Sequence, residues 1–291
     1  MNGRKGKSRR GQRRHIALKD GDAIARMKRA GQVVALVLDR LADSARPGIT
    51  TGELDRLAEA VIRSFGAIPT FYGLYDYPAN ICASVNDEVV HGIPGDRRLQ
   101  EGDIVSFDVG ATVEDVIADA AATVAVGAIS QDARRLLRVT REALHKGIEK
   151  ARPGNRVADI SAAIQNHAEG HGYGVVRKLV GHGVGYAMHE PPQVPNFVDG
   201  ATADSPELVP GMTLAIEPMI NAGTWQVTQD DDGWTYRTRD GSLSAHFEHT
   251  IAITEEGCEI LTLRTAAGRA HVVPENRPEA LAQRAPAGGQ L

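Results

Sequence analysis

Four stretches of the chain carry apolar residues at intervals of three and four, which is typical of helices that bury one face. They lie at 24–41, 50–65, 137–148 and 157–168. In the second stretch, Thr50 and Glu53 form a capping-box pattern ahead of the apolar residues, which favours a helix start there. Runs rich in β-branched and apolar residues predict strands at 104–110, 116–126, 213–220, 246–253 and 258–263. The chain between its two ends is therefore expected to alternate helices and strands.

The two ends have a different composition. Residues 1–19 contain eight Lys and Arg and no acid, so this segment cannot form a core, and we expect a disordered basic arm. The arm could make a weak contact with a polyanion such as ribosomal RNA, or it could be a solvated tail. Residues 266–291 are rich in Ala, Arg, Pro and Gly without an apolar period, which predicts a flexible tail. A catalytic or binding domain is left at 20–265.

The overall composition excludes several classes of protein. Of the 291 residues, 42% are hydrophobic and 24% are charged, with a net charge of −4, so the chain as a whole is not intrinsically disordered. No apolar run approaches the ~18 residues that span a bilayer. No apolar stretch follows the basic N-terminus, so it does not resemble a secretory signal. Cys82 and Cys258 are too few for a disulfide framework, and we expect a cytoplasmic protein.

The chain repeats a series of motifs, with one copy in each half. Arg46-Pro-Gly opens one predicted helix, and Arg152-Pro-Gly opens another. Each helix is followed by a Gly-rich turn and a His-Gly motif, which contains His91 in the first half and His182 in the second. Strand-like runs with acidic residues come next in both halves. Two such halves, packed around a pseudo-two-fold axis, would bring the acids of both to one place.

Two acids lie in the strand-like runs of each half: Asp108 and Asp119 in the first, Glu217 and Glu248 in the second. Side chains alternate along a strand, so Asp108, Glu217 and Glu248 each lie on the face opposite the apolar residues of their run. A turn expected at 110–115 would make Asp108 and Asp119 neighbours in a hairpin. All four side chains would then share one region of the fold.

Four converging carboxylates would repel one another, and a buried carboxylate alone would stay protonated or be strongly unfavourable. Two divalent cations would balance the four charges, with the imidazole of His182 as a fifth ligand. An oxygen-rich set with one imidazole suits Mn, Fe(II), Co or Mg rather than a structural thiolate zinc site. Each residue alone could equally be an ordinary turn, strand-end or loop residue. Their order and spacing together favour the metal site.

Five segments of the chain together resemble a type I methionine aminopeptidase, of the pita-bread metallopeptidase family. They lie at 84–95, 102–109, 181–191, 216–223 and 232–250, and the resemblance extends over about 24–263. It implies an α+β pita-bread fold of two pseudo-symmetric halves, with a curved antiparallel sheet covered by helices and a dinuclear metal site in the centre. Only 35 positions separate His182 from Glu217, which leaves no room for the helical subdomain that type II relatives insert there.

The resemblance also assigns roles to residues of this sequence. The implied metal ligands, for two ions of Co, Mn, Fe or Zn, are Asp108, Asp119, His182, Glu217 and Glu248. The implied catalytic residues are Glu217, as a proton shuttle, with His91 and His189 beside the substrate. The implied pocket for a methionine side chain contains Phe71, Tyr77, Cys82, Met188 and Trp234. Phe71 stands where relatives often have a smaller residue such as Cys, and Met188 stands where an aromatic residue is common. The pocket stays apolar, but its shape is expected to differ.

The implied activity is metal-dependent removal of the N-terminal methionine from nascent proteins and peptides whose second residue is small. The protein is expected to be monomeric and to have no membrane partner. One alternative is an X-Pro aminopeptidase or dipeptidase of the same fold. Another is a non-catalytic pita-bread module that only binds protein or RNA. Such a module would normally lack one or more metal ligands, and all five are present here.

Overall fold

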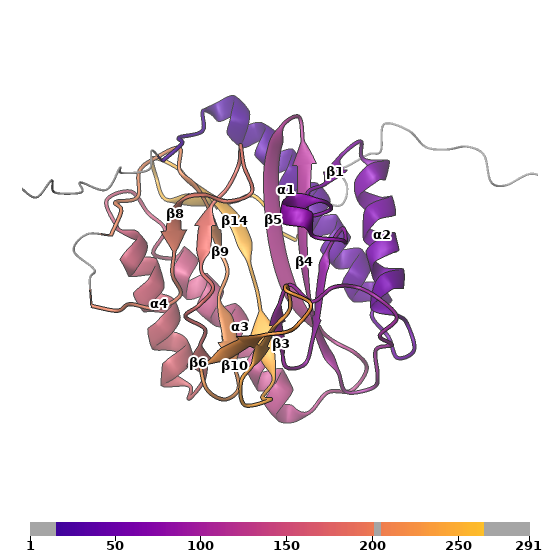
Figure 1. Cartoon of the computed structure of the whole chain (residues 1–291). Helices are drawn as coiled ribbons and strands as arrows, with labels where there is room; N and C mark the ends of the chain where they lie inside the picture. The colour runs from indigo at the N-terminus through magenta and orange to yellow at the C-terminus, as the bar shows by residue number, and fades with distance from the viewer. Residues whose placement is uncertain (1–15, 201–204, 265–291) are drawn as a thin grey trace, which may run out of the picture.

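The computed structural model describes residues 16–200 and 205–264. In this part of the chain four α-helices pack beside antiparallel strands (Figure 1). They are α1 (Gly21–Ser44), α2 (Thr51–Ser64), α3 (Gln131–Ile148) and α4 (Val157–Gly170). The capping box of Thr50 and Glu53 is present, and Asp20 and Ser130 cap α1 and α3 with their side-chain oxygens. All four predicted helices are confirmed, although α3 begins six residues before the predicted start at 137.

The strands of the first half form a four-stranded sheet around a long hairpin. Its strands are β1 (Ile68–Pro69), β2 (Cys82–Val85), β4 (Ile104–Val113) and β5 (Val116–Ala125), with β4 paired to all the others. The turn between β4 and β5 consists of Glu114 and Asp115, whose φ angles of 48° and 62° are those of a type I′ turn. The predicted turn at 110–115 was too long, because the ladder continues to the pair Val113–Val116.

The second half contains a five-stranded antiparallel sheet, one three-stranded sheet, and two of the three strands of another. The five strands, in spatial order, are β15 (Cys258–Ile260), β14 (His249–Ile253), β9 (Thr213–Ile216), β7 (Gly181–Gly183) and β8 (Glu190–Val194). One three-stranded sheet has the order β13 (Ser244–His246), β10 (Met219–Asn221) and β6 (Gly174–Val175). The other has the order β11 (Val227–Gln229), β12 (Tyr236–Thr238) and β3 (Glu88–Val90).

Two of the predicted strands are each divided in two at an acidic residue. The run 213–220 is broken at Glu217 between β9 and β10, and the run 246–253 is broken at Glu248 between β13 and β14. The breaks lie opposite each other, since β9 pairs with β14 and β10 pairs with β13. Pro218 has no N–H to donate to a ladder, and the N–H of Glu248 donates instead to the carbonyl oxygen of Ala121, at 2.9 Å. The prediction of two continuous strands was therefore wrong.

Threonine hydroxyls join the two halves along β5. The hydroxyl of Thr250 donates to the carbonyl oxygen of Asp119 at 2.8 Å and accepts from the N–H of Asp119 at 3.1 Å. The hydroxyl of Thr123 makes the same pair of bonds with the main chain of His246, at 2.9 and 2.8 Å. Phe247, between β13 and β14, packs against the apolar clusters of both halves. Along β5 the halves thus meet through side chains and the main-chain bond from Glu248 to Ala121, whereas β3 of the first half pairs directly with β12 of the second.

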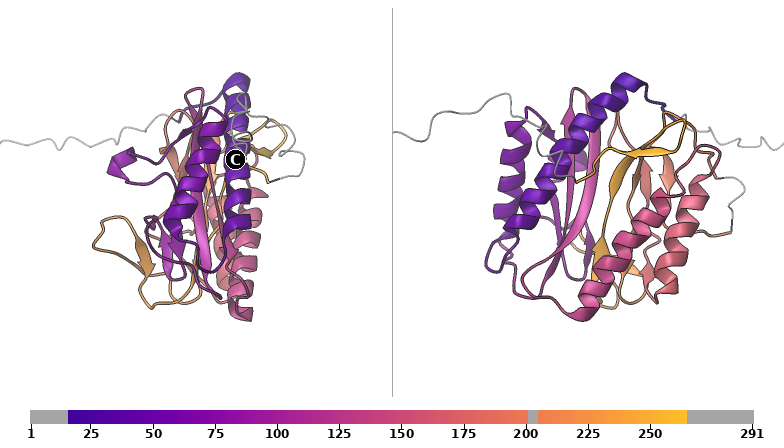
Figure 2. Two further views of the ribbon diagram at one scale, coloured as in Figure 1. Left: turned by 90° about the vertical axis from the view of Figure 1, so that its right-hand side faces the viewer. Right: turned by 180° about the vertical axis from the view of Figure 1, so that it is seen from behind.

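The helices lie on one side of the sheets, and the loops around η1 (Leu74–Asp76) and the β11–β12 hairpin project on the other (Figure 2). No helix in residues 16–200 or 205–264 is long and apolar enough to cross a membrane. Residues 1–15 of the predicted arm and the predicted tail at 266–291 lie outside the described residues. The structure ends the arm earlier than predicted, because Ile16 packs against the apolar cluster of the second half and Lys19 is buried.

Candidate active site

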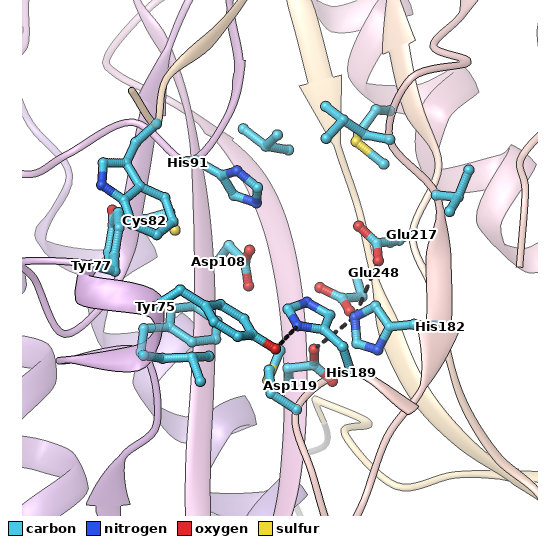
Figure 3. Close-up of a pocket in the computed structure, with 18 residues that line it drawn as sticks. Tyr75, Tyr77, Cys82, His91, Asp108, Asp119, His182, His189, Glu217 and Glu248 are labelled. Carbon is cyan, nitrogen blue, oxygen red and sulfur yellow. Dashed lines mark hydrogen bonds and ion pairs between the residues drawn. The ribbon is translucent and has the colours of Figure 1, made fainter. Parts of the chain in front are cut away.

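A cavity of about 200 Å³ lies where the two halves meet, and residues of both halves line it (Figure 3). All the residues to which the family resemblance assigns a role line it. They are Phe71, Tyr77, Cys82, His91, Asp108, Asp119, His182, Met188, His189, Glu217, Trp234 and Glu248. Segments that are far apart in the chain therefore come together as the repeat predicted, while the role of each residue is still a prediction.

The first two acids are held by the β4–β5 hairpin. Asp108 pairs with Ala121 and Asp119 pairs with Gly110, so the two acids are diagonal neighbours on one face of the hairpin. The hydroxyl of Thr250 shares its one proton between the carbonyl oxygen and a carboxylate oxygen of Asp119, each 2.8 Å away. The hydroxyl that joins the halves thus also orients one of the acids.

His182 is positioned by a strand that only glycines permit. It lies in β7 between Gly181 and Gly183 and pairs with Ala215 of β9. A Cβ at Gly181 would lie 2.4 Å from the carbonyl oxygen of Ala215, and a Cβ at Gly183 would lie 2.4 Å from that of Pro191. The neighbouring backbones therefore approach closely on both sides of His182, and its imidazole is directed at the acids.

The two acids of the second half, Glu217 and Glu248, reach the cavity from the two strand breaks. The Nε2 atom of His182 lies 3.4 Å from Oε1 of Glu217 and 3.7 Å from Oδ2 of Asp119. Asp119, His182 and Glu248 each have one donor atom within 4.8 Å of those of the other two, close enough to hold a metal ion. Figure 3 shows all four acids directed at the same space beside His182.

Burial and mutual repulsion dominate the electrostatics of these acids. Burial raises the pKa of Asp108 well above its usual range, and the nearby Asp119 raises this pKa further. Burial also raises the pKa of Glu217 and Glu248, with contributions from their acidic neighbours. The pKa of Asp119 is raised by burial as well, but His182 and the hydroxyl of Thr250 oppose the increase. Without compensating positive charge, the four groups could not all be ionised at neutral pH.

The donor set fits divalent metal ions. The buried Oδ1 atom of Asp108 has no hydrogen-bond partner among the described residues, and buried oxygens are rarely left in that state. Four carboxylates and one imidazole are hard or intermediate ligands that suit divalent first-row metal ions. The same charges that make the cluster unfavourable by itself would be neutralised by such ions.

Two further histidines lie at the edge of the acid cluster. Burial lowers the pKa of His91 to about 4. Burial, followed by electrostatic interaction with His182 and His91, lowers the pKa of His189 to about 4. Both rings are therefore neutral at pH 7 and can each donate one N–H. His91 also has a φ angle of 60°, an uncommon conformation for a residue other than glycine, and such outliers often occur at functional sites.

The other wall of the cavity is apolar. Phe71, Tyr77, Cys82 and Met188 are all buried and form one cluster, against which Trp234 packs. The rings of Tyr77 and Trp234 meet edge to face with centroids 5.0 Å apart. The hydroxyl of Tyr77 lies 3.1 Å from the carbonyl oxygen of Ile81 and 3.0 Å from that of Gly92, so the main chain satisfies it. This wall thus presents carbon and sulfur atoms beside the acids.

Sequence reasoning missed two residues of the site. Tyr75 projects from η1 with its ring stacked on that of His189, and its hydroxyl lies 3.4 Å from Nδ1 of that histidine. His246 is buried, and its Nε2 atom lies 3.7 Å from Oε2 of Glu217. A signal existed for each: three of the six tyrosines of the chain are at 72–77, and His246 is two positions before Glu248.

The loop that carries Met188 and His189 is supported by a buried ion pair. The carboxylate of Glu190 accepts hydrogen bonds from the N–H groups of Tyr186 and Ala187 and pairs with Lys19. The side chains of Lys19 and Glu190 are only 1% and 8% exposed. The last residue of the predicted basic arm is thus part of the framework of the site.

Comparison with known proteins gives the family. The sequence profile described as metallopeptidase family M24 matches residues 25–255, which is most of the chain. The chain belongs to metallopeptidase family M24. The expected pita-bread class of fold and the use of divalent metal by an enzyme of this family agree with that assignment.

The relatives within family M24 identify the activity. A methionine aminopeptidase of Clostridium acetobutylicum is 51% identical over 85% of this chain and 99% of its own length. Methionine aminopeptidase 1 of Bacillus subtilis is 51% identical over 81% of this chain and 94% of its own. The crystal structure of the methionine aminopeptidase from Rickettsia prowazekii is similar with a TM-score of 0.83 at 41% identity, over 86% of this chain and 100% of that one.

These relatives confirm the predicted resemblance to type I methionine aminopeptidases and the predicted enzyme class, a methionyl aminopeptidase. The prolidase from Pyrococcus horikoshii has a TM-score of 0.66 at 22% identity, over 85% of this chain and 64% of that one. At that identity the likeness concerns the fold alone, so it gives no support to the X-Pro alternative.

Proposed function

We propose that this chain removes the N-terminal methionine from nascent proteins and peptides whose second residue is small. The observation that carries the proposal is the meeting of two unlike walls in one cavity. One wall is a cluster of buried carboxylates with an imidazole, and the other is the apolar cluster of Phe71, Tyr77, Cys82, Met188 and Trp234. A thioether side chain fits the second wall, where contacts between sulfur and aromatic rings are favourable.

Asp108, Asp119, His182, Glu217 and Glu248 would hold two divalent ions, of Co, Mn, Fe or Zn. Two charges of +2 balance four carboxylates, which explains why the fold tolerates acids whose pKa is raised so strongly by burial. When bound, such ions supply Lewis-acid activation of a water molecule and of the peptide carbonyl group. The unpartnered oxygen of Asp108 supports a ligand role for that residue.

Within the cavity, Glu217 would accept the proton of the attacking water and pass it to the leaving amine. Its carboxylate lies between His182 and His246 and faces the cavity. Neutral His189 would donate its N–H to the carbonyl oxygen as negative charge develops there. Neutral His91, on the apolar side, would hydrogen-bond the amide nitrogen of the substrate. The substrate's free amine would be anchored at the acid cluster, which restricts cleavage to the first residue.

The size of the cavity supports a small substrate. At about 200 Å³ it is below the roughly 300–1,000 Å³ that is usual for pockets that enclose drug-sized ligands. Space for one side chain and a short length of backbone is what removal of one residue requires. The exposed ring of Tyr75 lies at the rim, beside His189, and would narrow the path of the second residue.

The test is a substrate panel combined with a metal count. We expect Met-Ala-Ser to be hydrolysed, Met-Leu-Ser to be hydrolysed far more slowly, and Ala-Pro peptides to be left intact. Metal analysis of the active protein should give two ions bound at the cavity, and replacement of any of the five ligands should weaken their binding. Preferential cleavage of Ala-Pro peptides would overturn the methionine assignment in favour of an X-Pro enzyme. Absence of hydrolysis at full metal content would favour a binding module.

We further propose that the protein acts as a cytoplasmic monomer on polypeptides that emerge from the ribosome. Residues 1–15 carry seven Lys and Arg, and a segment of that charge favours contact with RNA phosphates. Deletion of residues 1–15 should leave hydrolysis of Met-Ala-Ser unchanged and weaken co-sedimentation with ribosomes at low salt. Unaltered co-sedimentation would exclude a role of this segment in ribosome contact.

A further inference from the structure

Three metal-binding side chains meet far from the cavity, on the surface where α3 and α4 pack against each other. They are Glu142 of α3, His167 of α4 and His171, the C-cap residue that directly follows α4. Each offers one ligand atom, and these atoms all lie within 4.8 Å of one another. None of the three lines the candidate active site. We propose that they form a separate site for a divalent transition-metal ion such as Zn²⁺.

The local structure explains why the three side chains meet. His167 lies in the last turn of α4 and His171 caps the helix four positions later, a spacing that brings both rings to the same side of the helix end. The two ring centroids are 4.6 Å apart. The two helices run side by side (Figure 2), and Oε2 of Glu142 lies 3.2 Å from Nε2 of His167 across their interface. The site therefore takes ligands from two helices.

The chemistry of this set differs from that of the acid cluster. Two imidazoles and one carboxylate are the ligands of many open zinc sites, with water in the remaining positions. Imidazole suits Zn, Cu, Ni and Co, whereas Mg and Ca prefer oxygen ligands. Nδ1 of His171 lies 2.8 Å from the carbonyl oxygen of His167, to which it can donate, so that the other ring nitrogen keeps its lone pair for a metal.

The side chains are also partly ordered before any ion binds. The side chain of His167 is only 18% exposed, and that of Glu142 is 39% exposed. Arg138 competes for the carboxylate, because its Nη1 atom donates to both oxygens of Glu142, at 2.9 and 3.1 Å. An ion bound to Glu142 must displace this guanidinium or share the carboxylate with it. The competition gives the proposal a specific signature, since removal of Arg138 should strengthen metal binding.

The experiment is equilibrium dialysis of the full-length protein against Zn²⁺, with metal analysis of wild type and variants. We expect wild type to hold one more Zn²⁺ per chain than the double variant His167→Ala/His171→Ala at the same free concentration. Loss of a residue that only hydrogen-bonds to a metal ligand typically lowers metal affinity by about 10–100-fold. Loss of two ligands should therefore lower the Zn²⁺ affinity of this site by at least about 100-fold. His145→Ala, which removes a histidine from α3 outside the cluster, should bind as much Zn²⁺ as wild type.

Two further results decide between a metal site and a network of ion pairs without metal. Arg138→Gln should bind the additional Zn²⁺ more tightly than wild type, by several-fold. The double variant should hydrolyse Met-Ala-Ser as wild type does and have the same circular dichroism, which shows that the loss of Zn²⁺ is local. Equal Zn²⁺ content in wild type and the double variant would overturn the proposal. So would binding that is unchanged or weaker in Arg138→Gln.

Discussion

The acids of the first half and those of the second reach the same cavity by different backbone routes. Asp108 and Asp119 belong to two ten-residue strands of one regular hairpin, where their direction follows from the alternation of side chains. Glu217 lies between β9 and β10, and Glu248 lies between β13 and β14. At this point the ladder of β9 and β14 ends and that of β10 and β13 begins. A regular strand fixes a side chain by its neighbours in the ladder. A strand break frees the backbone to aim a side chain, and other contacts must then hold it in place.

Glu217→Gln tests whether Glu217, at a strand break, transfers protons in the reaction, a role that we do not assign to the acids of the hairpin. We expect kcat for Met-Ala-Ser to fall by about 10²–10⁴-fold, the usual loss of a general acid–base group, with little change in thermal melting. Asp108→Asn is the matched change in the hairpin. Its activity should recover in part at higher metal concentration, whereas that of Glu217→Gln should not. Near-normal hydrolysis by Glu217→Gln would reject the role as a proton shuttle.

Lys19→Met tests how far the second half depends on the start of the chain. The substitution leaves the buried carboxylate of Glu190 without its cation, and loss of one partner of a buried pair costs about 3–5 kcal/mol. We expect lower stability in denaturant melts and a higher KM, because the loop with Met188 and His189 is less well held. The control is deletion of residues 1–15, which keeps Lys19 and should change neither quantity. Equal behaviour of the two variants would mean that the pair does not support the loop.

The pH dependence of stability after metal removal tests how strongly the acids of the two halves repel one another. Burial and like charge raise the pKa of these groups in the folded protein, so the folded state binds more protons than the unfolded state. In the presence of chelator, stability should be greatest near the unfolded pKa values of about 4 and should decrease as pH rises above them. Each extra proton held by the folded state changes stability by about 1.4 kcal/mol per pH unit.

Denaturant and thermal melts between pH 5 and pH 8, with and without added metal, measure this effect. With metal bound, ions replace the protons, so the decrease with rising pH should be smaller and the melting temperature at pH 7 higher. A melting temperature that is unchanged after verified removal of metal would contradict the account of the acid cluster.

Two threonine substitutions separate the joining of the halves from the orientation of the ligands. Thr123→Val and Thr250→Val each remove a hydroxyl that bonds to the main chain of the other half, and each should lower stability by about 1–3 kcal/mol. Only Thr250 also bonds to the carboxylate of Asp119, so only Thr250→Val should weaken metal affinity, by about 10–100-fold. Calorimetric titration with metal gives the comparison. Equal affinities of the two variants would show that the hydroxyl of Thr250 does not tune the site.

The sequence was sufficient for those features that depend on local pattern. The four helices follow from apolar spacing and caps, and the hairpin of Asp108 and Asp119 follows from two strands and a turn. The resemblance to a known family, together with the repeat, predicted twelve residues at one site, and all twelve line the cavity. A repeat is informative because each half must bury its strands against the other.

The rest depends on contacts between distant segments that no local pattern reports. The run 213–220, which contains Glu217, has the composition of one strand. The interruption of the ladders becomes visible only in the structure, where the N–H of Glu248 bonds to Ala121 of the first half. Lys19 looks like the end of a charged arm because the carboxylate that it pairs with lies 171 positions later in the chain. Tyr75 is exposed in a short helical turn, where neither period nor burial marks it.

Phe247 has a consequence for how the enzyme assembles. It is partly buried and packs against the apolar clusters of both halves, while its neighbour Glu248 lines the cavity, so the position of Phe247 depends on both clusters at once. A fragment that ends before Phe247 would leave the first half with an uncovered surface and the second without a closing strand. Neither half is therefore a folding unit, and unfolding should proceed in one cooperative transition in which the metal centre and the core are lost together.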